Sequence, residues 1–265
     1  MKLIQKFLTQ NDCYKTHAAQ QIRGVMLHSV GCACESAENF ISSWNKPGVE
    51  VCVHAFCESG GDVYQTLPWA VRGWHAGKGL SGSANDGYIS VEMTEPKVLE
   101  YSSGGRFRIL DEAYAKKFVY ANYLTAAELI SGLCAKFGID PLEPGALISH
   151  SEGHALGIAS NHGDVEHLWC RFGITMDDFR VDVNKLLKNN TAKLINALEP
   201  NEISRRQPVS AGRLKSLLVN GKLMDMECIF AGGKNYIALQ ELKKLGIAVS
   251  YESAKKLPVL NSKKI

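Results

Sequence analysis

The sequence predicts an α/β protein with one sizeable domain, residues 1–188, followed by a smaller α+β module, residues 213–265. Short apolar runs typical of strands alternate with helical patterns throughout the first domain. A polar stretch with two prolines, residues 189–212, has the composition of a linker. The length of 265 residues fits this division, because single domains commonly hold roughly 100–200 residues.

The composition excludes several classes of protein. Hydrophobic residues make up 45% of the chain and charged residues 22%, which is ordinary for a globular protein with a full core. The net charge of +3 is too small to indicate nucleic-acid binding, but it is compatible with weak attraction to an anionic polymer such as a bacterial wall. No apolar run is long enough for membrane insertion. The first residues lack the features of a secretory signal, so we expect a chain made in the cytoplasm without a signal peptide.

Five runs of apolar and β-branched residues predict the strands of the first domain. They are residues 24–28, 49–57, 63–67, 88–93 and 146–150. The glycine-containing turn at residues 58–62 predicts a hairpin between the second run and the third.

Three segments predict helices. Residues 36–45 have an apolar side, and Ser36 can cap the first turn. Residues 113–137 repeat apolar side chains every three or four positions, and Gly138 is expected to end that helix. Residues 174–187 begin with Thr175 as a cap, with Asp178 three positions later, and predict the helix that closes the domain.

The eight cysteines are even in number, but the chain is too long to need a disulfide framework and has no export signal. We therefore expect most of them to be reduced and buried. The close pair Cys32 and Cys34 is a weak metal or redox signal, and a structural role in a loop is favoured.

Residues 148–169 hold four of the eight histidines and three acidic residues, and are predicted to form a loop that carries metal ligands. A catalytic zinc site needs three histidine or carboxylate ligands and one open position. His150 follows a short apolar run, as does His28 far upstream, so both are expected at strand ends that face a cleft. Our hypothesis is that His28, His150 and Asp164 hold one zinc ion. The alternative is that these histidines are ordinary packed or solvent-exposed residues.

Two further segments carry candidate site residues. Glu92 lies in an otherwise apolar strand, where a carboxylate is costly unless it is paired or functional. Trp74 and His75 precede a glycine-rich loop and could place aromatic edges beside a groove for a sugar, although Trp74 could equally be a core residue. With a zinc ion present, Glu92 would be the general base and then the general acid, and His162 would stabilise the oxyanion.

Five segments, in this order, resemble the type-2 N-acetylmuramoyl-L-alanine amidases, which include phage endolysins and share the fold of peptidoglycan recognition proteins. The segments are HSV after a strand, VHAFCESGGDVYQTLPW, GWHAG, YISVEM and the stretch from HSEG to HGDVEHLW. The resemblance covers about residues 1–188 and implies a central mixed sheet flanked by helices. It also implies hydrolysis of the amide between N-acetylmuramic acid and L-alanine in peptidoglycan.

By the same resemblance, His28 and His150 match the family's zinc histidines, and Glu92 matches its glutamate. His54 matches a histidine that lines the cleft beside the metal, so we predict that His54, Trp74 and His75 contact the substrate.

The third ligand departs from the usual family pattern. Asp164 has His162 two positions before it, as the pattern allows, but the loop after His150 is long and no proline follows. Counting back from Trp169 would make His162 the ligand instead. Asp164 is favoured.

The C-terminal residues 213–265 predict a separate module of strands with turns at 220–221 and 232–233, a helix at 239–245 and a last strand at 248–251. It resembles the small repeat of the N-terminal region of copper amine oxidases, without copper ligands. A unit of this size is marginal alone, so we expect it to bind the cell wall or to form a homo-oligomer.

The function we predict is that of a zinc amidase that cuts peptidoglycan. We expect a phage or prophage endolysin that reaches the wall after holin-type release or lysis. One alternative is a cytoplasmic muropeptide-recycling amidase, which would act on soluble fragments. The other is a non-catalytic peptidoglycan-binding protein, which would lack a metal ligand.

Overall fold

The structure is a computed structural model that describes residues 1–198, 212–219, 222–231, 234–237, 247–252 and 257–262. The chain forms two compact units, Met1–Ser204 and Arg205–Ile265. The boundaries 188 and 213 remain a prediction. No helix among the described residues is long and apolar enough to span a membrane.

The first unit is built on a six-stranded mixed sheet in the order β1-β4-β3-β5-β2-β8. Its strands are β1 (Lys2–Gln5), β2 (Gly24–Ser29), β3 (Ala55–Cys57), β4 (Asp62–Gln65), β5 (Tyr88–Met93) and β8 (Leu147–Ser149). β3 and β4 form the predicted antiparallel hairpin, and all the other neighbours in this sheet are parallel. The predicted central mixed sheet flanked by helices is confirmed.

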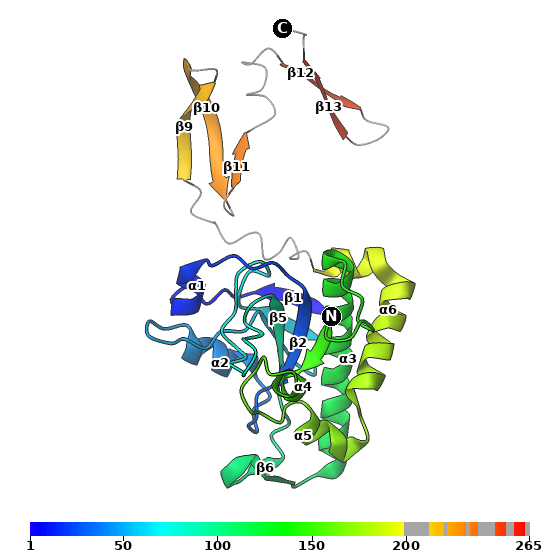
Figure 1. Cartoon of the computed structure of the whole chain (residues 1–265). Coiled ribbons are helices and arrows are strands. Elements are labelled where there is room, and N and C mark those ends of the chain that lie inside the picture. Colours follow the sequence, from blue (N-terminus) through cyan, green and yellow to red (C-terminus); the bar gives the residue numbers. More distant parts are fainter. Residues whose placement is uncertain (199–211, 220–221, 232–233, 238–246, 253–256, 263–265) are drawn as a thin grey trace. The chain divides into compact units, whose positions relative to one another are not determined.

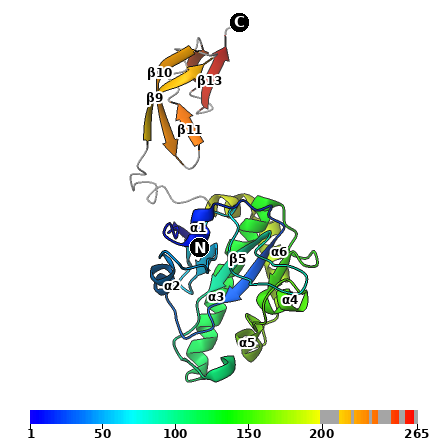
Figure 2. The same cartoon turned by 60° about the vertical axis from the view of Figure 1, so that its left-hand side comes forward.

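Helices cover both faces of the sheet because its strands bury side chains on both sides. In β3, Ala55 and Cys57 belong to the core with helices α3 (Glu112–Phe137) and α6 (Met176–Ala197). Phe56, on the alternate face, packs with α1 (Asp12–Thr16) and α2 (Ala37–Trp44). Figures 1 and 2 show α3 and α6 together, with α1 and α2 on the other side of the sheet.

Ser36, Thr175 and Gly138 play their predicted parts at helix ends, whereas the last helix runs past its predicted end into residues predicted as linker. Ser36 caps α2 by accepting from the backbone N–H of Glu38. Asp111 caps α3, and Gly138, with φ 67°, ends it in the left-handed region. Thr175 Oγ1 accepts from the N–H of Asp178 at 3.1 Å at the start of α6, which then continues to Ala197, beyond residue 188.

Two predictions about local structure are wrong. Only the last three residues of the expected strand 49–57 lie in the sheet, because Cys52 instead forms an isolated bridge with Trp74. The expected loop after β8 begins with helix α4 (His150–Ala155). Ser149 and Glu152 form a capping box at its start, a signal present in the sequence that fixes His150 as the first helical residue.

Several short elements were not expected from the sequence. The hairpin of β6 (Leu99–Tyr101) and β7 (Phe107–Ile109) follows β5, and α5 (Glu166–Trp169) follows the histidine-rich stretch. Short 3-10 helices span Ser103–Gly105 and Cys170–Phe172. Seven cysteines of the first unit are free thiols, and four of them, Cys13, Cys52, Cys57 and Cys134, are buried.

The second unit contains two antiparallel arrangements. β9 (Gly212–Val219), β10 (Lys222–Ala231) and β11 (Lys234–Ile237) form a three-stranded sheet in the order β11-β10-β9. β12 (Ile247–Glu252) pairs with β13 (Leu257–Ser262), a strand not expected from the sequence. The predicted turns and helix 239–245 lie outside the described residues, and the resemblance to copper amine oxidases stays a prediction.

Candidate active site

Strand order brings distant residues to one edge of the sheet. β2, β5 and β8 are parallel, so their carboxyl ends meet at the same edge. His28 near the end of β2 lies opposite Glu92 of β5. Leu27 lies opposite Ser149 of β8, which places His150, the next residue, beside His28.

His28, His150 and Asp164 form a compact group of donor atoms. His28 Nδ1 lies 3.1 Å from His150 Nδ1 and 3.2 Å from Asp164 Oδ2. His150 Nδ1 lies 3.8 Å from the same carboxylate oxygen. Ligand bonds of about 2.0–2.2 Å in a tetrahedral zinc site separate the donor atoms by about 3.3 Å. The three donors therefore fit zinc, and they are the one such group found among the described residues.

The outer nitrogens of both imidazoles have partners of their own. His28 Nε2 lies 3.0 Å from His75 Nδ1, and His150 Nε2 lies 3.3 Å from Ser160 Oγ. Both rings thus direct Nδ1 toward the group and Nε2 away from it.

The group is electrostatically coupled. Burial opposes protonation of His28, but the hydrogen bond to Asp164 and the charge of Glu92 outweigh it and raise the pKa of His28. Burial and the neighbouring positive charge of His28 lower the pKa of His150 to about 4. Burial raises the pKa of Asp164, but the bond to His28 and its charge leave it below the usual value. An anionic oxygen and a neutral imidazole are thus ready to bind a cation.

Glu92 has the titration behaviour of an acid–base group. Its side chain is partly buried, and this burial raises its pKa to about 8, although the charge of His28 opposes the shift. A carboxyl group with a pKa near neutrality can both accept and return a proton at cellular pH.

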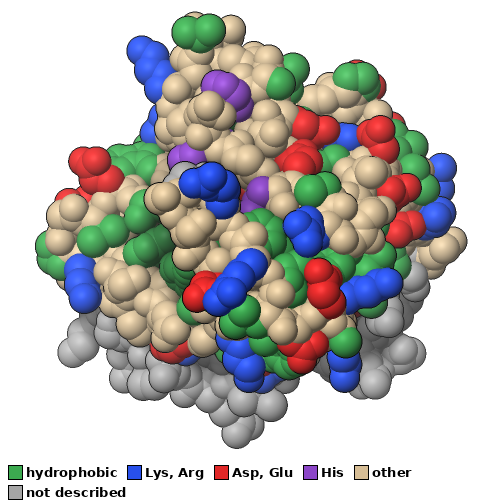
Figure 3. Space-filling view, turned by 90° about the horizontal axis from the view of Figure 1, so that it is seen from below, with side chains coloured by type: hydrophobic (Ala, Val, Ile, Leu, Met, Phe, Trp, Pro, Cys, Tyr) green, Lys and Arg blue, Asp and Glu red, His purple; other side chains and the backbone are tan. Residues whose placement is uncertain are grey.

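The donor group and Glu92 line one cavity of about 670 Å³. The lining also includes the apolar side chains of Trp44, Val51 and Val53. Figure 3, a view from below Figure 1, shows histidine side chains at the surface among acidic and basic groups. The cavity therefore brings together the donor group, a carboxyl group with a raised pKa and apolar side chains.

The two candidates for the third ligand lie in different places relative to the donor group. Asp164 belongs to the donor group, and 12% of its side chain is exposed. His162 lies outside the group: its ring is exposed and stands 4.6 Å, centroid to centroid, from that of His150. His162 still lines the cavity.

The three predicted substrate contacts occupy different places. His54 does not line the cavity, because it is fully buried with Nδ1 2.8 Å from Ser90 Oγ and Nε2 2.8 Å from the Val71 carbonyl. Trp74 lines a neighbouring hollow that shares Val51 with the cavity. His75 does line the cavity, but its Nδ1 faces His28.

A buried polar network in the cavity wall was not expected from the sequence. Glu95, fully buried, accepts from the N–H of Gly31 at 3.1 Å and from the Tyr101 hydroxyl at 2.5 Å. His167 Nε2 lies 3.3 Å from Glu95 Oε1. Burial opposes the charge on His167, but the bond to Glu95 raises its pKa. The one available sequence signal was a carboxylate two residues after the buried strand β5.

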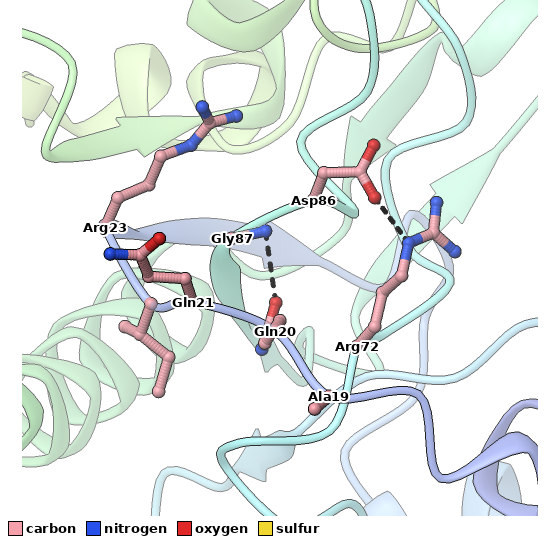
Figure 4. Close-up of a pocket in the computed structure, with 8 residues that line it drawn as sticks. Ala19, Gln20, Gln21, Arg23, Arg72, Asp86 and Gly87 are labelled. Carbon is pink, nitrogen blue, oxygen red and sulfur yellow. Dashed lines mark hydrogen bonds and ion pairs between the residues drawn. The ribbon is translucent and has the colours of Figure 1, made fainter.

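A second hollow, of about 510 Å³, lies near the beginning of β2 and contains none of the predicted site residues. Figure 4 shows its main polar contacts, the ion pair between Arg72 and Asp86 and the bond from the Gly87 N–H to Gln20. These groups already have partners, so the histidine cavity remains the candidate active site.

Residues 18–165, more than half of the chain, match the family model described as N-acetylmuramoyl-L-alanine amidase. The chain belongs to this family. The amidase resembles the Staphylococcus aureus hydrolase AmiA, solved in complex with its ligand, with 16% identity and a TM-score of 0.51 over 71% of this chain and 83% of that one. It also resembles the catalytic domain of XlyA, with 19% identity and a TM-score of 0.51 over 69% of this chain and 99% of that one. No curated protein matches it.

The structural likeness supports the fold, and the family match gives the activity. The amidase is thus an enzyme that hydrolyses the bond between N-acetylmuramic acid and L-alanine in peptidoglycan.

Proposed function

We propose that this amidase is zinc-dependent, with His28, His150 and Asp164 as the ligands and Glu92 and His162 as the groups that assist hydrolysis. The observation that carries the proposal is the triangle of donor atoms, separated by 3.1, 3.2 and 3.8 Å. When bound, zinc polarises a carbonyl and lowers the pKa of water to about 7.

The chain's own residues supply the proton transfers. Glu92, in the same cavity and opposite His28 in register, accepts a proton from the attacking water. It then returns that proton to the nitrogen of the departing L-alanine as the carbon–nitrogen bond breaks. The products are a lactyl carboxylate on the sugar and a free amino group on the peptide.

His162 is placed to assist at the attacked carbonyl. Its exposed ring lines the cavity beside His150, so a ring N–H can donate to the oxygen on which negative charge develops. In the same cavity lining, Trp44, Val51 and Val53 offer an apolar surface for the lactyl and alanine methyl groups.

We further propose that the protein acts on intact cell walls, as a phage or prophage endolysin does. Support comes from the second compact unit that accompanies the amidase fold. A recycling amidase would instead prefer soluble muropeptides. Two assays with the full chain distinguish these functions: the fall in turbidity of purified sacculi, and the release of peptides from soluble muropeptides. We expect efficient clearing of the sacculi.

The zinc assignment is tested by metal analysis of the purified protein combined with a muropeptide digest. We expect one zinc per chain, together with new lactyl carboxylates and alanine amino termini in the digest. Activity should disappear with a chelator and return with zinc. Full lytic activity after exhaustive removal of all metal would overturn the assignment.

A further inference from the structure

We propose that the segment His75–Ala76, held by Asn85, positions both zinc-binding histidines, so that His75 acts through His28 and not on the substrate. The inference rests on the proposed zinc site. It assigns a structural task to the GWHAG motif, whose aromatic residues the sequence alone suggested as a sugar-binding edge.

The first contact joins His75 to His28. Their facing atoms, His75 Nδ1 and His28 Nε2, are 3.0 Å apart, and the rings meet edge to face at 82°. His28 must keep a lone pair on Nδ1 to bind a metal, so its ring hydrogen is on Nε2. His75 Nδ1 is then the acceptor, and the hydrogen of a neutral His75 is on Nε2.

The second contact reaches His150 through Ser160. The Ser160 hydroxyl donates to the carbonyl of Ala76 at 3.2 Å, and its backbone N–H donates to the same carbonyl at 2.8 Å. The hydroxyl lone pairs are therefore available to accept from His150 Nε2–H, which lies 3.3 Å away. Adjacent residues, His75 and Ala76, thus set the same tautomer in both ligands.

The supporting segment is itself fixed. Asn85 Oδ1 accepts from the backbone N–H groups of His75 and Ala76, at 2.7 and 2.9 Å. A Cβ on Gly73 would stand 3.0 Å from His75 Cδ2, and one on Gly77 would stand 2.9 Å from Ser160 Oγ. Gly77 also has φ +65°, which disfavours other residues. The two glycines therefore leave the space in which these two contacts form.

Metal-binding histidines usually donate their outer N–H to a carboxylate, a carbonyl or water, and loss of that partner typically weakens metal binding about 10–100-fold. Here the acceptor for His28 is a second imidazole. A substitution that removes this acceptor can therefore be compared with one that keeps an acceptor in the same place.

The test compares His75→Leu with His75→Asn. Leucine fills space without an acceptor, whereas the asparagine Oδ1 takes the place of histidine Nδ1. Zinc affinity is measured by competition with a chromogenic chelator at fixed pH. We expect His75→Leu to bind zinc about 10–100-fold more weakly than the wild type, and His75→Asn to recover most of the loss. Ser160→Ala should weaken binding through His150, and His154→Ala, which removes an exposed imidazole outside the group, should not.

A second readout is nitrogen NMR of the zinc-loaded protein. The His28 Nε2–H should exchange slowly in the wild type and in His75→Asn, and faster in His75→Leu. Unchanged affinity and unchanged exchange in His75→Leu would overturn the inference while leaving the zinc site intact. Absence of zinc binding by the wild type would instead overturn the proposed function. If circular dichroism shows that His75→Leu does not fold, zinc affinity and Nε2–H exchange are measured in His75→Asn and Ser160→Ala instead. Unchanged values in Ser160→Ala would then contradict the inference.

Discussion

His28 and Glu92 lie directly opposite each other on the parallel strands β2 and β5. A proposed metal ligand and the proposed proton carrier therefore share one rigid piece of sheet, and their separation does not depend on a loop. This arrangement suits a reaction in which both groups act on the same water molecule.

Replacing Glu92 should separate chemistry from metal binding. We expect Glu92→Gln to lower kcat/KM on a defined muropeptide by about 10²–10⁴-fold, because the proton carrier is lost. Zinc content should stay at the wild-type level, since Glu92 is outside the donor group. Glu143→Gln, at an exposed glutamate away from the cavity, is the matched control. Full turnover by Glu92→Gln would show that another group carries the proton.

Asp164 and His162 should respond differently to truncation. Asp164→Ala removes one donor atom of the group, so we expect loss of bound zinc and of activity together. His162→Ala should keep its zinc and lose about 10²–10³-fold in kcat, the usual effect of removing one oxyanion donor. Metal analysis and steady-state kinetics check both. The opposite pattern, with zinc lost only from His162→Ala, would make His162 the third ligand.

The pair of His167 and Glu95 predicts a pH-dependent contribution to stability. The pKa of His167 is raised above the ordinary 6.5 in the folded protein, with burial opposing and Glu95 favouring the charged form. The stabilisation is therefore complete below about pH 6.5 and is lost as the pH rises through the raised folded value. In urea unfolding, His167→Gln should cost more stability at pH 6 than at alkaline pH. A cost that stayed constant or grew with pH would contradict the pairing.

The capping box before His150 links helix stability to the site. Ser149 Oγ accepts from the N–H of Glu152 at 3.0 Å, so Ser149→Ala should lower the free energy of unfolding by about 1 kcal/mol. Because α4 begins at His150, we also expect weaker zinc binding. Ser36→Ala, which removes the cap of α2, should cause a similar loss of stability with no change in zinc affinity. Equal zinc affinity in both variants would show that the Ser149 cap does not contribute to metal binding.

The long, regular elements could be predicted because local pattern and tertiary burial agree in them. β5 and α3 are examples: one is a run of apolar and β-branched residues, and the other repeats apolar residues at helical spacing. Residues 49–53 have a strand-like composition although they lie outside the main sheet. Val53 packs in the core with α2 and also lines the cavity, where no ladder of the main sheet is needed.

Chain order and residue type alone indicated His28, Glu92 and His150, because side chains at the ends of parallel strands meet wherever the sheet forms. Sequence could not decide between His162 and Asp164, since both lie in one loop and only its path sets which reaches His28 Nδ1. The sequence also could not give the partner of His75. The residues around a histidine look the same in the sequence whether its ring faces a substrate or another histidine. Only the packing of residues 73–77 against β2 and Ser160 decides which nitrogen has a neighbour, since a hydrogen bond depends on separations of a few tenths of an ångström.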